Sequence, residues 1–215
     1  MQKRNYQLEL DRLIANIPDG ETPSLLLHAC CAPCSSYTLE YLSKYFSITI
    51  FFYDPNISPE EEFYKRADEL KRLLSEMPLA NPASLIVADY NADEFYSAVK
   101  GMEDLPEGGE RCYVCYKLRL ERTAQLAAER GFDYFGTTLS ISPYKNAQWL
   151  GDISEELSGI YSVRNLPADF KKRGGYKRSI ELSKQYSLYR QDYCGCIFSK
   201  QERERQKAEL YKRYE

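Results

Sequence analysis

Short apolar segments that alternate with helical segments constrain the fold of this chain more than any other feature. Four segments rich in Leu, Ile, Val, Phe and Tyr predict strands, at 24–28, 48–53, 84–88 and 134–138. Helical patterns lie between them, at 36–45, 58–76, 92–99 and 113–130. Strands and helices that alternate in this way form a parallel sheet covered by helices on both faces. We therefore predict an α/β fold with a parallel sheet of about four to five strands.

The two ends of the chain are predicted to be helical. An apolar stripe indicates a first helix over 6–14, and beyond Pro143 the strand signal fades. Helical patterns then follow at 147–157, 179–186 and 199–214. We expect a single domain over 1–215, with an α/β core at about 22–142 and a helical, basic C-terminal part at about 143–215.

A capping box is expected to start the helix that begins near residue 58. Ser58 has the character of an N-cap, Pro59 suits the first helical position, and Glu61 would complete the box. The sequence thus predicts a helix boundary at this point, just after the Asp54–Pro55 turn.

The seven cysteines all fall into three tight clusters. They are Cys30, Cys31 and Cys34 in the first, Cys112 and Cys115 in the second, and Cys194 and Cys196 in the third. Isolated core cysteines would be scattered along the chain. Clusters this tight bring several sulfurs to one point, which suits a metal, an iron–sulfur cluster or a redox dithiol.

The first two clusters are expected to meet at one edge of the sheet. Each lies at the start of a predicted helix, where oriented N–H groups favour thiolate, and ligands of parallel α/β sheets bind beyond the carboxyl ends of the strands. Two such pairs suit either tetrahedral zinc or a [4Fe–4S] cluster. The adjacent Cys30 and Cys31 favour the cluster, because zinc ligands typically stand about two to four residues apart.

Other residues near these clusters have open roles. Cys194 and Cys196, separated by one glycine, suit a small-ring, easily reduced disulfide or two more metal ligands. Cys34 could bind a separate metal. Asp54 could be a proton donor, a metal ligand or only a turn former. His28 is the only histidine, and a structural, hydrogen-bonded role is favoured for it.

One basic segment suggests a nucleic-acid partner. The chain carries a net charge of −3, yet residues 161–190 hold eight Lys and Arg against two acidic residues, interleaved with aromatic residues. A solvated helix face is the alternative. The candidate contacts to RNA phosphates are Lys171, Lys172, Arg173, Lys177, Arg178 and Arg190.

The chain shows no sign of export or membrane insertion. Its first residues are polar and charged, and its apolar runs are far shorter than the roughly 20 residues of a membrane span. We expect a cytoplasmic protein without a membrane partner, in a compartment where clustered thiols stay reduced and favour metal or redox chemistry.

Five motifs, in order from about residue 24 to 200, resemble those of one family, the cobalamin-independent epoxyqueuosine reductases or QueH family. The motifs are HACCAPC at 28–34, YDPNI at 53–57, RCYVC at 111–115, SPYKN at 142–146 and YRQDYCGC at 189–196. The cysteine pattern shows no departure from the family's pattern. The resemblance implies a fold similar to the adenine-nucleotide α-hydrolase (HUP) type.

The resemblance also implies an oxidoreductase of tRNA queuosine biosynthesis. Such an enzyme reduces epoxyqueuosine, at the wobble base of a tRNA, to queuosine, with electrons from a donor that the sequence does not identify. Carried over, Cys30, Cys31, Cys112 and Cys115 would hold a [4Fe–4S] cluster, and Cys194 and Cys196 would be a redox-active pair forming a disulfide. An additional iron beside the cluster is implied, for which Cys34 and Asp54 are candidate ligands.

The reaction agrees with the residues. Removing the epoxide oxygen consumes two electrons and two protons, which a dithiol can store, and the target base must be splayed out, which aromatic side chains near Tyr189 could assist. One rival is a tRNA-thiolating enzyme of the ATP-pyrophosphatase type, although segment 28–34 lacks the glycines of a phosphate loop. A non-enzymatic, zinc-stabilised RNA-binding module and a thiol redox sensor are the others.

Overall fold

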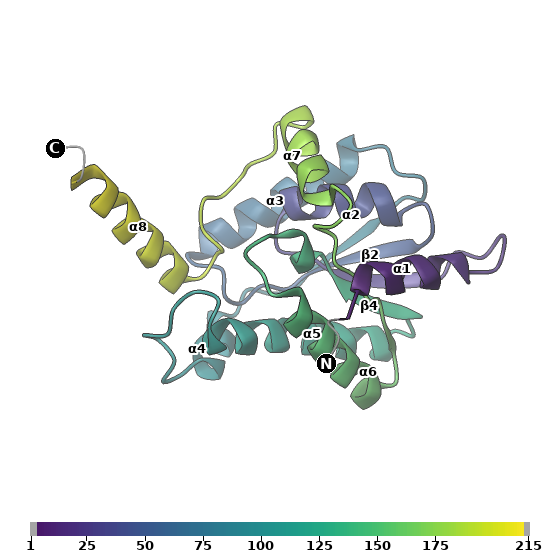
Figure 1. Cartoon of the computed structure of the whole chain (residues 1–215), viewed down its shortest axis with the longest axis horizontal. Helices are drawn as coiled ribbons and strands as arrows, with labels where there is room; N and C mark the ends of the chain where they lie inside the picture. The colour runs from purple at the N-terminus through teal and green to yellow at the C-terminus, as the bar shows by residue number, and fades with distance from the viewer. Residues whose placement is uncertain (1–3, 213–215) are drawn as a thin grey trace.

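The predicted parallel sheet forms the centre of the molecule (Figure 1). The structure is a computed structural model that describes residues 4–212. Its five strands are β1 (Ser24–His28), β2 (Ser47–Phe52), β3 (Ser84–Val87), β4 (Tyr134–Thr137) and β5 (Arg164–Asn165). The α/β prediction and the upper estimate of the strand number are therefore confirmed.

The strand order places one crevice at the carboxyl edge of the sheet. The order is β3-β2-β1-β4-β5, and every neighbouring pair is parallel. The connection from β1 leads to β2 on one side, whereas β4 lies on its other side, so the chain order reverses at β1. Ligands of open α/β sheets bind at such a switch point, which here lies where His28, Phe52 and Thr137 end their strands.

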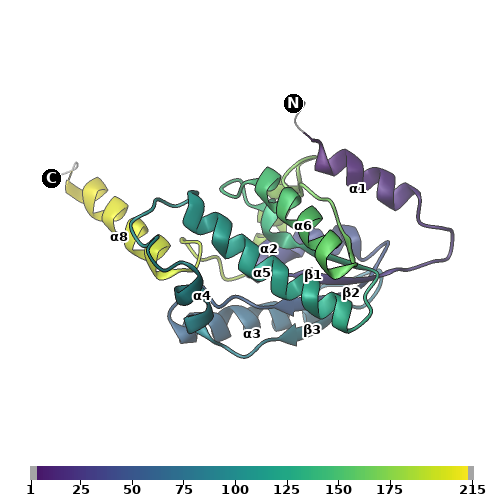
Figure 2. The same ribbon diagram turned by 90° about the horizontal axis from the view of Figure 1, so that it is seen from below.

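Helices cover both faces of the sheet (Figures 1 and 2). The helices are α1 (Tyr6–Ala15), α2 (Ala32–Leu42), α3 (Glu60–Glu76), α4 (Ala92–Ala98), α5 (Glu110–Glu129), α6 (Ala147–Tyr161), α7 (Gly175–Gln185) and α8 (Ile197–Lys212), with a short 3-10 helix, η1 (Thr138–Ile141). All of the predicted helices are present, with boundaries shifted by a few residues. Thus α2 begins at Ala32 rather than near residue 36, and α5 begins at Glu110.

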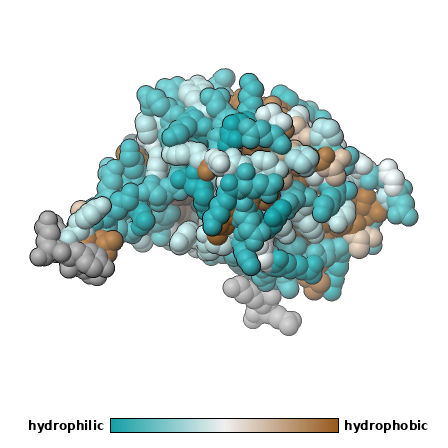
Figure 3. Space-filling model, turned by 90° about the horizontal axis from the view of Figure 1, so that it is seen from above, coloured by the Kyte–Doolittle hydropathy of each residue, from teal (hydrophilic) through white to brown (hydrophobic). Residues whose placement is uncertain are grey.

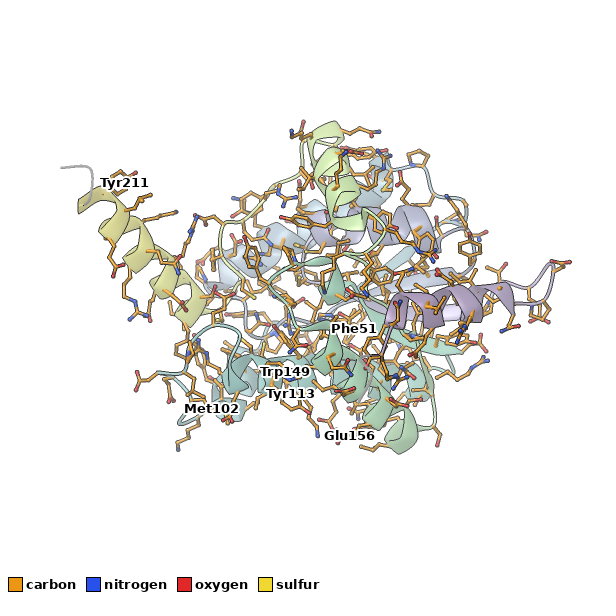
Figure 4. The ribbon with its side chains drawn as sticks, viewed as in Figure 1. Phe51, Met102, Tyr113, Trp149, Glu156 and Tyr211 are labelled. Carbon is orange, nitrogen blue, oxygen red and sulfur yellow. The ribbon has the colours of Figure 1, made fainter. Side chains whose placement is uncertain are left out.

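Alternate residues of the central strand feed two apolar cores. Leu25 and Leu27 of β1 pack with α2, α3 and α7, whereas Leu26 packs with α5 and α6. In the second core, Trp149 of α6 meets Tyr113 of α5 edge-on at 5.5 Å between ring centroids, so the tryptophan is a packing residue (Figure 4). The two cores fix the sheet between its helical layers.

The predicted capping box of α3 is wrong. Pro59 occupies the N-cap position and no side chain caps the helix. The physical reason is a tertiary contact, because Ser58 uses its backbone to bind a distant loop: its N–H donates to the Gly195 carbonyl at 2.9 Å. The sequence analysis also did not predict strand β5. Two residues are too few to show an alternating apolar pattern, and they form a strand only because they pair with β4.

The last helix, α8, projects from the body, which it meets mainly at its first turns (Figures 1 and 2). The face of the molecule seen from above is mostly hydrophilic, with small apolar areas scattered over it (Figure 3). None of the described helices is both long and apolar enough to cross a membrane.

Candidate active site

All three cysteine clusters meet at the carboxyl edge of the sheet. Cys30 and Cys31 follow β1, and Cys34 lies in the first turn of α2. Cys112 and Cys115 lie in the first two turns of α5, while Cys194 and Cys196 end the loop before α8. All seven are free thiols. The parallel topology therefore brings together cysteines that are more than 160 residues apart in sequence.

The first cluster is a compact group of three sulfurs. The Sγ atoms of Cys30, Cys31 and Cys34 all lie within 4.8 Å of one another. The Cys30 thiol donates to Cys31 at 3.9 Å. This hydrogen bond, a second one from Cys34 and the charge of Arg66 lower the pKa of Cys31 well below its usual value, so the group favours one thiolate.

The other four cysteines line one small cavity, here called the cysteine cavity. Its lining is Asn56, Phe95, Glu107, Arg111, Cys112, Cys115, Tyr116, Arg119, Cys194, Cys196 and Ser199. Burial raises the pKa of Cys115 to about 12 and that of Cys196 to about 11, and it also raises the pKa of Cys112. Cys112 packs against the apolar core that holds Cys30 and Cys31, whereas Cys115 and Cys196 belong to a separate small apolar cluster. Lys145 lies near both sulfur groups, because it donates to Cys194 and its charge opposes the rise in the pKa of Cys30.

Three cationic side chains surround the sulfurs. Arg66 and Arg119 are buried, and Lys145 Nζ donates to Cys194 Sγ at 3.0 Å. Burial alone would lower the pKa of Lys145, but the negative charge of a Cys194 thiolate raises it well above its usual value. Arg66 Nη2 and Arg119 Nη2 are buried and have no hydrogen-bond partner within residues 4–212. Arg66 pairs with Glu62 and Arg119 with Asp54, so each arginine has one N–H group left for a further acceptor.

Asp54 and His28 are buried side by side at the strand ends, with His28 Nε2 3.5 Å from Asp54 Oδ1. Asp54 is buried, its Oδ1 accepts from Arg119 Nη1 at 2.9 Å, and its Oδ2 has no hydrogen-bond partner in the described part of the chain. His28 Nδ1 lies 2.9 Å from Thr137 Oγ1 and its Nε2 lies 3.2 Å from the Tyr53 carbonyl. Since both of its ring nitrogens are engaged, His28 has the structural role that was expected.

Helix α3 holds the loop that carries Cys194 and Cys196. Arg66 Nη1 donates to the Cys194 carbonyl at 3.1 Å, and the Tyr189 hydroxyl donates to Glu62 at 3.0 Å. The Tyr193 hydroxyl donates to the Ser58 carbonyl at 3.0 Å. Because Tyr189 and Tyr193 both bind to the helix or its start, they position this loop.

Gly195 is required where the loop passes α3. Its φ is +142°, and an added Cβ would lie 3.2 Å from Arg66 Nη1 and 3.2 Å from a side-chain carbon of Ile57. We therefore expect Gly195→Ala to destabilise the protein by about 1–3 kcal/mol and to reduce activity by displacing the cysteine pair. Thermal denaturation and activity would be measured together.

Gly20→Ala is the matched control for this change. Gly20 also has a positive φ, of +83°, but no atom of residues 4–212 lies within 4 Å of an added Cβ. It should lose stability through backbone strain while keeping full activity. If Gly195→Ala were as active as the Gly20→Ala control, the close approach to Arg66 would have no catalytic importance.

A larger pocket opens outward from the cysteine cavity. This outer pocket has a volume of about 550 Å³, within the range of small-molecule sites. Its lining is Glu107, Gly108, Ser142, Tyr144, Lys145, Gln191, Asp192, Tyr193, Cys194, Ser199, Glu202, Arg203 and Gln206. Because Glu107, Cys194 and Ser199 line both spaces, a ligand at the base of the outer pocket would reach Cys194.

Comparisons with known proteins agree with this arrangement. Residues 25–202 match the family model described as "Epoxyqueuosine reductase QueH". The chain belongs to the QueH family. Proteins named epoxyqueuosine reductase QueH include those of Streptococcus pyogenes serotype M1 (44% identity, covering 92% of this chain and 79% of the relative), Staphylococcus epidermidis (44%, 92% and 85%) and Thermotoga maritima (39%, 87% and 95%).

The site of this QueH chain suits an anionic iron–sulfur cofactor. Its donors are buried and half-buried thiols at two helix N-termini, and the unpartnered N–H groups of Arg66 and Arg119 in the described chain complement the negative charge of thiolate and sulfide. The sulfurs of Cys30 and Cys31 group with Cys34, while Cys112 and Cys115 share their cavity with Cys194 and Cys196.

The predicted RNA contacts in this QueH chain do not form one uniform patch. Lys171 pairs with Asp169, Arg173 with Asp11, and Arg178 with Glu40 and Glu181. Lys172, Lys177 and Arg190 are exposed and lie in none of the ion pairs of the described residues. A pocket of about 550 Å³ joins Lys171 and Lys172 to Arg4 and Lys145, next to the cysteine site.

Several residues of this QueH site escaped the sequence analysis. Arg66 and Arg119 occupy helices, where an isolated Arg is usually solvated, and no local pattern marks them as buried. Lys145 lies in the SPYKN motif, and that motif was the one signal that could have identified it.

Proposed function

We propose that this chain reduces epoxyqueuosine to queuosine at the wobble position of tRNA. The observation that carries the proposal is the convergence of seven free thiols and three cations beneath an open pocket, in a member of a family named for this activity. Because modified tRNA is the proposed substrate, the cytoplasm is the proposed compartment.

We propose Cys30, Cys31, Cys112 and Cys115 as the ligands of a [4Fe–4S] cluster. The support is the placement of both pairs at helix N-termini on one sheet edge and the packing of Cys112 against the apolar core that holds Cys30 and Cys31. When bound, such a cluster supplies single-electron transfer.

We propose Cys34 and Asp54 as ligands of an additional iron. Cys34 lies within 4.8 Å of the two cluster cysteines before it, and the buried Asp54 Oδ2 lacks a hydrogen-bond partner in residues 4–212. An iron with an open position would act as a Lewis acid toward an epoxide oxygen.

The Cys194–Cys196 pair balances the overall reaction. Oxidation of the two thiols to a disulfide releases two electrons and two protons, and these convert the epoxide into an alkene and one water molecule. An external electron donor then returns two electrons and two protons to the pair. Cys194 lines the outer pocket and contacts Lys145, whereas Cys196 is buried behind it.

The tRNA backbone is proposed to follow the basic residues near this site. Lys171→Glu combined with Lys172→Glu should weaken binding by about tenfold or more for each phosphate that is no longer bound, since a charged hydrogen bond contributes roughly 1.5 kcal/mol or more. The slope of log affinity against log salt should fall by about one for each such phosphate. Fluorescence anisotropy with labelled tRNA at several salt concentrations measures both.

Lys44→Glu with Lys71→Glu is the matched control. Both lysines are exposed, lie in none of the described ion pairs, and stand at or near the far ends of helices that start at the site. The control makes the same change in net charge and should bind tRNA normally. Equal losses of affinity in both double variants would mean that net charge alone governs binding.

The proposed activity is tested by anaerobic purification with iron and sulfide analysis. The loaded enzyme would then be incubated with epoxyqueuosine-containing tRNA and a reductant, and the nucleosides analysed. Conversion to queuosine is expected. A colourless, zinc-containing protein without conversion would instead favour the RNA-binding module, and sulfur transfer into tRNA would favour the thiolating enzyme.

A further inference from the structure

The outer pocket carries an aromatic side chain, Tyr144, whose ring is not packed against the rest of the described chain. Tyr144 is 82% exposed, more than any other large apolar or aromatic side chain of the described residues. Its backbone N–H donates to Ser142 Oγ at 3.3 Å, which fixes the turn that carries it. Tyr211 is also highly exposed, by 75%, but it lies near the far end of α8 (Figure 4). A fully exposed ring at the rim of a pocket is a surface on which a base can stack.

The position of Tyr144 relates it to the reacting groups. The next residue, Lys145, donates to Cys194 Sγ, so the exposed ring is one residue away from a side chain that contacts the thiol, and all three residues line the same pocket. A planar base stacked on Tyr144 could therefore direct a substituent inward. Gln191, which also lines the pocket, has a buried Oε1 without a hydrogen-bond partner in the described chain, an acceptor suited to the N–H edge of a guanine-like base.

The same pocket has two acidic groups without cationic partners in the described chain. The Glu107 N–H donates to Glu202 Oε2 at 3.4 Å, and Glu107 Oε2 accepts from Ser199 Oγ at 3.0 Å. Neither carboxylate belongs to an ion pair within residues 4–212. Two carboxylates that line one pocket favour a bound cation, and a secondary alkylamine such as the one in the side chain of epoxyqueuosine is protonated near neutral pH.

We propose that the outer pocket holds the wobble nucleoside turned out of the anticodon loop, with Tyr144 as its stacking surface and Glu107 and Glu202 as the partners of its side-chain ammonium. This proposal rests on the proposed function and specifies its substrate site. In this proposal, Tyr144 contributes affinity for any base at the wobble position. Glu107 and Glu202 distinguish the modified base from guanosine.

Binding of two anticodon stem-loop RNAs tests the proposal. One carries epoxyqueuosine at the wobble position and the other guanosine, and dissociation constants are measured without an electron donor so that no turnover occurs. Tyr144→Ala should weaken binding of the modified RNA by about 5- to 150-fold, whereas Tyr144→Phe should retain it. Glu202→Gln should reduce the preference for the modified RNA over the guanosine RNA.

Tyr64→Ala is the matched control, because Tyr64 is an exposed tyrosine of α3 outside the pocket. It should bind both RNAs as the unaltered protein does. Unchanged binding by Tyr144→Ala, or an unchanged preference in Glu202→Gln, would overturn the proposed site. Failure of the function itself is distinguishable, since the unaltered, iron-loaded protein would then bind without converting epoxyqueuosine.

Discussion

Cys112→Ser is expected to abolish both the iron–sulfur cluster and the activity. The hydroxyl is close in size to the thiol, but it does not provide the thiolate that iron requires, so the loss would follow from the missing sulfur rather than from a cavity. Activity should fall by more than the roughly 10- to 100-fold typical of losing an outer-shell partner. Iron and sulfide content, the visible spectrum and conversion of tRNA would be measured on anaerobically purified protein.

Cys34→Ser is the informative comparison for this experiment. The Cys34 sulfur lies within 4.8 Å of those of Cys30 and Cys31, so proximity alone would make it an alternative cluster ligand. With the proposed ligand set, Cys34→Ser should retain the cluster and lose at most the additional iron. The opposite result would be full iron content in Cys112→Ser and no cluster in Cys34→Ser. Cys34 would then be the cluster ligand in place of Cys112.

Cys196→Ser is expected to retain the colour and iron content of the cluster while stopping multiple turnover. A single thiol cannot close a disulfide, so the pair could no longer deliver two electrons and two protons. The remaining Cys194 would still lie 3.0 Å from Lys145, and Ser199 N–H could bind the new hydroxyl as it binds Cys196 Sγ at 3.4 Å. Product formed per enzyme in the presence of excess reductant measures the effect.

Cys194→Ser should give the same result, because both members of the pair are needed. The shared cavity makes the opposite outcome meaningful, since Cys194 and Cys196 line it together with Cys112 and Cys115. If either substitution removed the iron, these cysteines would be ligands and the redox role would have to be reassigned.

The sequence predicted the frame of the site because that frame depends on local patterns. Apolar runs located β1, β2 and β4, and a parallel sheet places the residues after such strands at one edge. Cys30, Asp54 and the SPYKN motif therefore had to lie near one another. The first two cysteine clusters were located at helix N-termini for the same reason.

Contacts between distant segments determined the rest. The start of α3 shifted because the Ser58 backbone binds the Gly195 loop, a partner more than 130 residues away. Arg66 and Arg119 lie in helices with many charged residues, and only tertiary packing buries them. The pairing of Lys171, Arg173 and Arg178 with acidic residues likewise arose from folding, so a count of charges overstated the free basic surface.

The order of the site residues along the chain has a consequence for how the enzyme matures. During synthesis, Cys30, Cys31, Cys112 and Cys115 leave the ribosome well before the loop that α3 later holds. N-terminal segments fold first, so the proposed cluster ligands can assemble while the side that Cys194 and Cys196 will cover is still open. With the proposed ligand set, iron and sulfide therefore have a wider route to these four cysteines in the nascent chain than after the loop has docked on α3.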